Sequence, residues 1–233
     1  MVEIKGIEKF SSRDFPGHIS STVFLGGCTF RCPYCHNSDL VLRPESIQTM
    51  PVDIFLSYLD GRKGWLEAVC LSGGEPLLHE DIEDIIRVVR ERGLLVKLDT
   101  NGSFPERLEG LLTAGLLDWV AMDVKAPLER YREVTRSNVD VESIVRSADI
   151  LRNSGTRHTF RTTVVPGLVE KEDVVKIGEW LNGAANYLIQ QFVPQTTIDP
   201  AFLEVKPFSR AELEDIVAAA KPYFQDVRIE GPE

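Results

Sequence analysis

The sequence of 233 residues lacks several features that would each indicate a class of protein. No apolar run approaches the ~20 residues that a membrane-spanning helix needs, and the first residues lack the apolar stretch of a signal peptide. Basic residues are outnumbered, with 26 Lys and Arg against 36 Asp and Glu, and the net charge of −10 argues against a nucleic-acid partner. We therefore expect a cytoplasmic protein with no membrane or nucleic-acid partner.

Two common catalytic signatures are missing, and cysteine is scarce. There is no phosphate-binding loop of the GxxxxGK type and no Ser-His-Asp order, so NTPase and hydrolase functions lack support. Of only four cysteines, Cys28, Cys32 and Cys35 fall within eight positions. In a reducing compartment such a group more often binds metal or performs redox chemistry than forms disulfides. Cys70 stands alone in an apolar segment and is expected to be a small buried hydrophobe in a strand.

Short β-rich segments alternate with helical segments along most of the chain. The expected strands are 22–26, 68–72, 95–100, 119–124, 159–165 and 187–193. Between them, apolar residues recur at a helical spacing, as in the face formed by Ile82, Ile85, Ile86 and Val89. This alternation predicts an α/β fold with a parallel sheet and right-handed crossovers. Six strands are too few for a closed eight-stranded barrel, so they would form an incomplete barrel or a doubly wound sheet.

The remaining segments extend this core at both ends, and we expect one domain over 1–233. Residues 1–20 are expected to form an N-terminal hairpin with its turn at Asp14-Phe15-Pro16-Gly17. The core covers 21–195. Residues 196–233 are expected to contain a helix, begun by a capping box of Ser209 and Glu212, and a final strand.

Polar residues gather where the expected strands end. In either α/β architecture, ligands bind at the carboxyl ends of the strands. The sequence places there Gly73, Gly74, Glu75, Asp99, Asn101, Asp123, Lys125 and Arg161. So many polar loops in succession predict a polar site along this edge of the sheet.

The three clustered cysteines form a C-x3-C-x2-C pattern on one short loop. A cubane iron–sulfur cluster has four irons, usually each with one thiolate ligand. Three cysteines would bind three irons and leave the fourth open to a bidentate ligand such as an amine and a carboxylate. The alternative is a zinc site made of Cys28, Cys32, Cys35 and His36, although structural zinc sites more often use two separated pairs of ligands.

Taken together, these motifs resemble the radical S-adenosylmethionine (SAM) superfamily. The likeness lies in C-x3-C-x2-C with Tyr34 before the third cysteine, followed by Gly-Gly-Glu-Pro at 73–76. Within it, the segments 7–11, 14–17, 32–37, 99–102 and 122–125 are similar to the activating enzymes of glycyl radical proteins. The likeness is greatest to the activators of anaerobic ribonucleoside-triphosphate reductase and extends to those of pyruvate formate-lyase. The resemblance covers essentially the whole chain and implies a partial (β/α)6 TIM-type barrel.

The resemblance also implies a cofactor pair and an activity. Cys28, Cys32 and Cys35 would hold a 4Fe-4S cluster, and SAM would chelate the open iron. An electron from the cluster would split SAM into methionine and a 5′-deoxyadenosyl radical. That radical would then take a hydrogen from a glycine Cα on a partner enzyme.

Roles near SAM follow from the same resemblance. Gly73, Gly74 and Glu75 would lie next to its ammonium group, where a Cβ would block close approach. Arg161 would bind its carboxylate. Tyr34 would lie near the adenine, and His36 would lie near a cluster sulfur or shape the adenine pocket.

A second group of residues is expected to form a cation site. Two carboxylates that lie close together at the same edge of the sheet repel each other unless a cation lies between them. The resemblance places a monovalent cation between Asp99 and Asp123, with Thr100 as a further oxygen ligand. Asn101 would shape this loop, and Lys125 would contact the ribose or these carboxylates.

The partner is left open by the sequence. Between Cys35 and the Gly-Gly-Glu-Pro motif there is one cysteine, Cys70, and it is expected to be buried in a strand. A single cluster is therefore expected, and the electrons would come from a donor such as flavodoxin or ferredoxin. The first hypothesis is an activase of anaerobic ribonucleoside-triphosphate reductase, with the pyruvate formate-lyase type as its variant. A second is a radical SAM enzyme acting on a small molecule, similar to 7-carboxy-7-deazaguanine synthase. A third is a non-enzymatic zinc or iron–sulfur scaffold.

Overall fold

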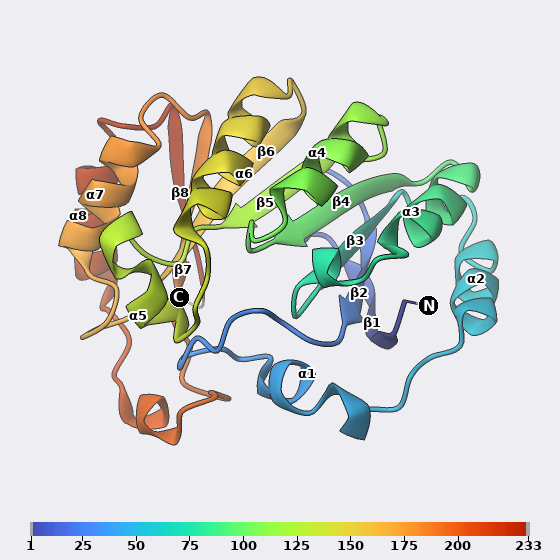
Figure 1. Ribbon diagram of the computed structural model, residues 1–233, viewed down its shortest axis with the longest axis horizontal. Coiled ribbons are helices and arrows are strands. Elements are labelled where there is room, and N and C mark those ends of the chain that lie inside the picture. Colours follow the sequence, from blue (N-terminus) through green and yellow to red (C-terminus); the bar gives the residue numbers. More distant parts are fainter. Residues whose placement is uncertain (1, 232–233) are drawn as a thin grey trace.

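The computed structural model describes residues 2–231, which contain one eight-stranded sheet with its strands in chain order (Figure 1). The first two strands pair antiparallel and all later neighbours pair parallel. The strands are β1 (Ile4–Ser11), β2 (Ser20–Leu25), β3 (Ala68–Gly73), β4 (Leu95–Thr100), β5 (Trp119–Asp123), β6 (Arg157–Val164), β7 (Asn186–Gln191) and β8 (Asp226–Glu230).

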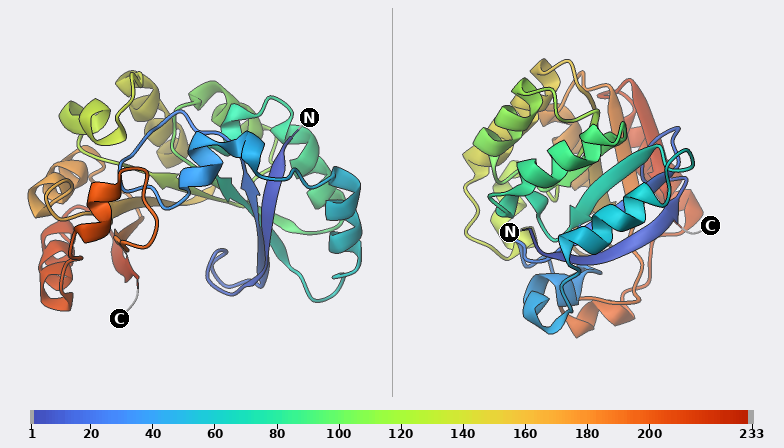
Figure 2. Two further views of the ribbon diagram at one scale, coloured as in Figure 1. Left: turned by 90° about the horizontal axis from the view of Figure 1, so that it is seen from below. Right: turned by 90° about the vertical axis from the view of Figure 1, so that its right-hand side faces the viewer.

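Helices flank the outer side of this curved sheet, and its inner side stays open along one flank (Figure 2). β1 and β8 are the two edges and do not pair with each other, so the barrel is incomplete, as predicted. The helices are α1 (Ser38–Leu42), α2 (Val52–Asp60), α3 (Ile82–Glu91), α4 (Pro105–Thr113), α5 (Tyr131–Thr135), α6 (Val141–Asn153), α7 (Lys171–Trp180) and α8 (Arg210–Ala220). Short 3-10 turns are η1 (Pro44–Ser46), η2 (Pro76–Leu78), η3 (Leu128–Arg130) and η4 (Pro200–Glu204).

All six strands expected for the core are present, each within two residues of its expected bounds. The predicted N-terminal hairpin is also present, but its return arm is β2 itself, which begins at Ser20. The capping box of Ser209 and Glu212 begins α8, and the expected final strand is β8. Eight strands therefore comprise the six expected in the core and one at each edge.

The core lies between the sheet and the surrounding helices. The predicted apolar face of α3 is buried, because Ile82, Ile85, Ile86 and Val89 are each at most 5% exposed. The helix stops before Gly93, whose φ of +74° suits a residue without a Cβ at a helix end. The helical spacing thus predicted the buried side correctly.

The turn of the hairpin covers the inner side of the sheet at the amino ends of the strands. Phe15 is buried there against Ala68 and Cys70, and its ring meets Trp119 edge-on at 6.4 Å between centroids. Cys70 is fully buried in β3, which confirms the prediction that it packs as a hydrophobe. The opposite, carboxyl ends of the strands are left for the polar loops. No helix among the residues described is long and apolar enough to cross a membrane.

Candidate functional site

The cysteine loop follows β2 and lies at the carboxyl ends of the strands. Cys28, Cys32 and Cys35 are all free thiols; Cys32 is buried and the other two are half-buried. Cys28 Sγ accepts hydrogen bonds from the Phe30 backbone N–H at 3.4 Å and from Asn101 Nδ2 at 3.7 Å. The second contact ties the cysteine loop to the loop after β4.

Burial controls the acidity of these thiols. It raises the pKa of Cys28 to about 11 and that of Cys32 to about 12, while the positive charge of Lys125 acts in the opposite direction on both. Thiolates need nearby positive charge or metal to persist in such surroundings. The loop therefore presents three cysteine sulfurs that are largely shielded from solvent and lie near the positive charge of Lys125.

The donor set fits a cluster with one open iron. The fourth cysteine, Cys70, packs with Phe15 at the other end of the strands and is not available to the loop. The zinc alternative would need Cys28, Cys32, Cys35 and His36 around one ion, and among residues 2–231 no three or more Cys, His, Asp and Glu side chains are arranged in that way. Ligands of a cubane are spread over several irons and need not converge on one point.

The Gly-Gly-Glu-Pro loop packs directly against the backbone that carries Cys28. Gly73 has a φ of +116°, and a Cβ there would lie 2.4 Å from the Leu25 backbone. A Cβ on Gly74 would lie 1.8 Å from the Gly27 carbonyl oxygen, which also accepts the Glu75 backbone N–H at 2.8 Å. We expected these glycines to make room for a ligand; within the protein itself they make room for another loop.

Glu75 is completely buried and holds two loops together. Its carboxylate accepts hydrogen bonds from Leu77 N at 3.0 Å, Thr100 Oγ1 at 2.8 Å and Asn101 N at 2.6 Å. Burial raises the pKa of this carboxyl to about 7, although the three donors lower it in part. Glu75 thus fixes the loop after β3 to the loop after β4.

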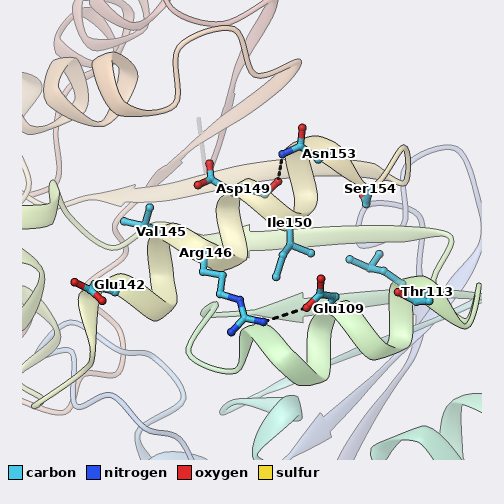
Figure 3. A pocket seen from close by; sticks show the side chains of 10 residues that line it. Glu109, Thr113, Glu142, Val145, Arg146, Asp149, Ile150, Asn153 and Ser154 are labelled. Atoms are coloured by element: carbon cyan, nitrogen blue, oxygen red, sulfur yellow. Dashed lines mark hydrogen bonds and ion pairs between the residues drawn. The ribbon is translucent and has the colours of Figure 1, made fainter.

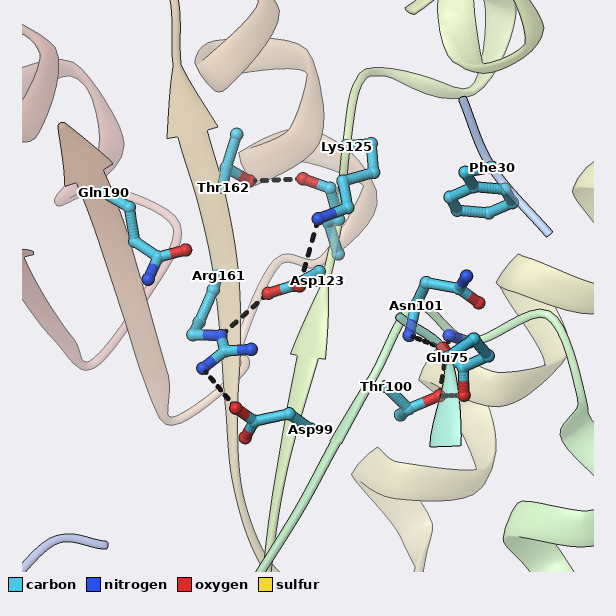
Figure 4. Close-up of polar contacts among 12 residues, drawn as sticks. Phe30, Glu75, Asp99, Thr100, Asn101, Asp123, Lys125, Arg161, Thr162 and Gln190 are labelled. Carbon is cyan, nitrogen blue, oxygen red and sulfur yellow. Dashed lines mark hydrogen bonds and ion pairs between the residues drawn. The ribbon is translucent and has the colours of Figure 1, made fainter. Parts of the chain in front are cut away.

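A chain of alternating charges crosses the carboxyl ends of β4, β5 and β6 (Figure 4). Arg161 donates from Nε to Asp123 Oδ1 at 2.7 Å and from NH1 to Asp99 Oδ2 at 3.2 Å. Lys125 Nζ donates to Asp123 Oδ2 at 3.0 Å, and Lys97 Nζ donates to Asp99 Oδ1 at 2.5 Å. The five charged side chains come from β4, β5 and β6, which are neighbours in the parallel sheet, or from the residues just after them.

The cations decide the protonation state of both carboxylates. Burial alone would raise the pKa of Asp123, but the charges of Arg161 and Lys125 outweigh it and hold this pKa below its usual range. Asp99 shows the same balance, with Arg161 and Lys97 lowering its pKa against burial. Both aspartates are therefore ionised at neutral pH.

The structure does not support the predicted monovalent cation between Asp99 and Asp123. That prediction rested on repulsion between Asp99 and Asp123, and here the Arg161 guanidinium lies between them. Thr100, the proposed further ligand, is buried and donates its hydroxyl to Glu75. Lys125 contacts the Asp123 carboxylate, one of the two positions expected for it.

Lys97 is a site residue that we did not predict. It is 5% exposed and pairs with Asp99 two positions later in β4. Side chains of a strand alternate between the two faces of a sheet, so residues 97 and 99 share the inner face. This alternation within Leu95–Thr100 was the signal that could have found it.

Tyr34 and His36 lie outside both networks. Tyr34 is buried, and its hydroxyl has no hydrogen-bond partner among the atoms of residues 2–231. His36 is exposed. Of the predicted site residues, the structure therefore brings Cys28, Glu75 and Asn101 into one network and Asp99, Asp123, Lys125 and Arg161 into another.

A surface hollow of about 630 Å³ lies away from this site, between α4 and α6 (Figure 3). Its rim carries Glu109, Glu142, Arg146 and Asp149. Arg146 is already paired there with Glu109 at 3.1 Å. None of the predicted site residues lines the hollow, so we do not place the chemistry there.

Comparison with known sequences decides the family. The sequence model of the Radical SAM superfamily matches residues 22–181, which include the three clustered cysteines, the Gly-Gly-Glu-Pro loop and the charged network. The chain belongs to the radical SAM superfamily. Membership implies a 4Fe-4S cluster and SAM as cofactors.

Two curated relatives place this radical SAM protein more closely. A candidate glycyl-radical enzyme activating enzyme of Methanocaldococcus jannaschii is 34% identical over 231 residues, covering 97% of this chain and 95% of the relative. The pyruvate formate-lyase-activating enzyme of Streptococcus mutans is 27% identical over 208 residues, covering 84% of this chain and 78% of that enzyme. The protein is a radical SAM enzyme of the glycyl-radical enzyme activating group.

Solved structures share the fold of this radical SAM protein. SuiB of Streptococcus suis, crystallised with SAM, aligns with a TM-score of 0.67 at 15% identity, covering 88% of this chain and 48% of SuiB. Coproporphyrinogen III oxidase of Escherichia coli aligns with a TM-score of 0.59 at 16% identity, covering 88% of this chain and 52% of that enzyme. This chain thus spans about half the length of these two solved chains.

Proposed function

We propose that this protein activates anaerobic ribonucleoside-triphosphate reductase by generating a glycyl radical on it. The proposal of this partner rests on the motif segments 7–11, 14–17 and 32–37 and their likeness to activators of that enzyme. The single observation that supports the site is the Asn101 contact with Cys28, because it joins the cysteine loop to the loops expected around SAM.

In this proposal Cys28, Cys32 and Cys35 hold the 4Fe-4S cluster and leave one iron open. When bound, the cluster supplies an electron that splits SAM and so provides the 5′-deoxyadenosyl radical. The residues of the chain position SAM, keep water away and fix the local charges. With Cys70 buried elsewhere, the electrons come from an external donor such as flavodoxin or ferredoxin.

The two networks would divide the binding of SAM between them. Glu75 holds the Gly73–Gly74 backbone in place, and this backbone would present its polar groups to the SAM ammonium. Arg161 uses Nε and NH1 on the aspartates, so its NH2 group remains for the SAM carboxylate. Lys125 would face the nucleoside side, Asn101 would shape the loop after β4, and the buried Tyr34 ring would pack near the adenine.

The open flank of the sheet suits a protein substrate. A 5′-deoxyadenosyl radical must form close to its target hydrogen and away from water. β1 and β8 are the two edges of the sheet and do not pair with each other, so a loop of a partner would enter between these edges to reach the carboxyl ends of the strands. A backbone glycine on such a loop would then meet the radical without a change in the barrel.

The test is an anaerobic incubation of the protein with SAM, a chemical reductant and one candidate partner at a time. Ribonucleoside-triphosphate reductase should give the doublet of a glycyl radical by electron paramagnetic resonance, and pyruvate formate-lyase should give none. A doublet with pyruvate formate-lyase alone would overturn the proposed partner. Multiple turnovers of deoxyadenosine release with no protein partner, given a small molecule, would favour the small-molecule hypothesis instead.

A further inference from the structure

One end of the molecule carries an exposed aromatic and basic surface that the site does not use. We define the hairpin-end patch by seven residues from β1, the hairpin turn and the segment between α2 and β3: Lys9, Phe10, Arg13, Ile19, Arg62, Lys63 and Trp65. Hydrogen bonds hold these segments side by side: Glu67 N donates to Ile19 O at 3.0 Å, and Tyr58 OH donates to Lys9 O at 2.7 Å.

The two aromatic side chains of the patch are the most exposed large hydrophobics described. Trp65 is 80% exposed and Phe10 is 63% exposed. The backbone around Trp65 is fixed, because Trp65 N and Leu66 N both donate to Arg62 O at 3.0 Å. Leu66 turns inward and is buried, while the indole is presented to the outside. Exposed Trp and Arg side chains are the types that dominate binding at protein interfaces.

The charge of the patch is opposite to that of the chain, whose net charge is −10. Lys9, Arg13 and Lys63 have no side-chain ion pair or hydrogen bond within residues 2–231, and the Arg62 guanidinium only stacks over Tyr58 at 5.6 Å. Two nearby carboxylates are already engaged: Glu67 accepts from Ile19 N at 2.9 Å, and Asp60 accepts from Arg92 at 2.8 Å. An acidic protein surface would complement this set.

The place of the patch favours one kind of partner. It lies at the amino ends of the strands, and six residues of strand separate this end from the cysteine loop by about 20 Å. Electron transfer weakens steeply with distance, so an electron donor gains nothing by docking here. A protein substrate needs to place only one loop near the cluster, and the rest of its surface can bind at a distant part of this protein. β1, which carries Lys9 and Phe10, borders the open flank through which that loop would enter (Figure 2).

We propose that the hairpin-end patch docks an acidic surface on the body of the glycyl radical enzyme, apart from its glycine loop. This inference rests on the proposed function. The variants are Arg62→Glu/Lys63→Glu and Trp65→Ser, which change exposed side chains only. The matched control is Lys206→Glu/Lys221→Glu, with the same change in net charge at two other exposed lysines.

Each variant is assayed with SAM and dithionite against two substrates. One is intact reductase or intact pyruvate formate-lyase, with the glycyl radical counted by electron paramagnetic resonance. The other is a synthetic peptide of the glycine loop, deuterated at its glycine, with deuterium counted in the 5′-deoxyadenosine formed. We expect the rate on the intact partner to fall about tenfold in both patch variants, and to lose its salt dependence in Arg62→Glu/Lys63→Glu, which alters the charges. The rate on the peptide should not change, and the control should match the wild type.

Wild-type rates on the intact partner in both patch variants would overturn the docking role. An equal loss on the peptide would also overturn it, because the patch would then act on the reaction site. If the wild-type protein forms a radical on neither partner and transfers no hydrogen from the peptide, the proposed function itself fails, and this inference with it.

Discussion

Glu75 accepts a hydrogen bond from the backbone N–H of Asn101 at 2.6 Å, and this contact joins the loops that follow β3 and β4. The carboxylate has no exposed surface and has two further donors, Leu77 N and Thr100 Oγ1. Asn101 in turn reaches the sulfur of Cys28. One buried acid therefore sets the relative position of three loops at the site.

Replacing Glu75 by Gln should destabilise the fold. The amide keeps one acceptor oxygen but turns an NH2 group toward backbone or hydroxyl donors, so at least one buried donor loses its partner. We expect the free energy of unfolding in urea, measured without oxygen on the cluster-free protein, to fall by about 1–3 kcal/mol.

The matched control is Glu80→Gln, at a side chain that is 90% exposed and pairs with Arg107. Its unfolding free energy should change by less than about 0.5 kcal/mol. Equal stability of the Glu75→Gln variant and the wild type would show that the buried carboxylate does not hold these loops.

Replacing Arg161 by Met should have an effect that depends on pH. In the wild type the pKa values of Asp99 and Asp123 are lowered, so these groups stabilise the fold above the usual Asp pKa of about 3.9. Without the guanidinium, burial is opposed only by Lys97 at Asp99 and by Lys125 at Asp123, so both pKa values rise and ionising the carboxylates stabilises the fold less. Because each aspartate keeps its lysine, the loss should be smaller than the roughly 3–5 kcal/mol expected when a buried charge is left with no partner.

The loss in Arg161→Met should therefore be largest at neutral pH and should shrink as the pH falls toward 4. Urea unfolding at a series of pH values measures it. Arg157→Met, at an exposed arginine in the same strand, should show a small change that does not vary with pH. A loss that is constant from pH 7 to pH 4 in Arg161→Met would contradict the charge balance described for Asp99 and Asp123.

Two glycine-to-alanine changes should act in opposite directions. Gly74→Ala would place a Cβ 1.8 Å from the Gly27 carbonyl, so the loop beside Cys28 must shift and both unfolding temperature and iron uptake should fall. Gly110 lies exposed in α4, and an added methyl group there would meet no atom within 4 Å outside its own helix backbone. Gly110→Ala should raise stability by up to about 1 kcal/mol. Equal melting temperatures for the two variants would argue against the tight packing of the two loops.

Much of the fold was readable from the sequence because its signals are local. The β-rich runs and the helical face of α3 depend on neighbours a few residues apart, and both were predicted correctly. The partners of the charged residues depend on strand register. The pairing of Asp123 with Arg161 in neighbouring strands, which puts a guanidinium where we expected a free cation, needed the assembled sheet.

The same limit applies to the inner face. Glu75 could be placed at a strand end from its motif, but not as a buried link between two loops. Lys97 was missed because it lies two positions before Asp99 in β4, outside the 99–102 segment that drew attention to that strand. Alternation along the strand puts Lys97 on the same face of the sheet as Asp99, and this signal would have identified it.

We propose that the loop cysteines, and not Cys70, hold an iron–sulfur cluster that cleaves SAM. The most direct test compares Cys32→Ala with Cys70→Ala after anaerobic reconstitution with iron and sulfide, by iron content and by deoxyadenosine formed from SAM. Cys70→Ala should take up about four irons per chain and cleave SAM, whereas Cys32→Ala should lose the cluster and all cleavage. Normal SAM cleavage by Cys32→Ala would contradict this proposal.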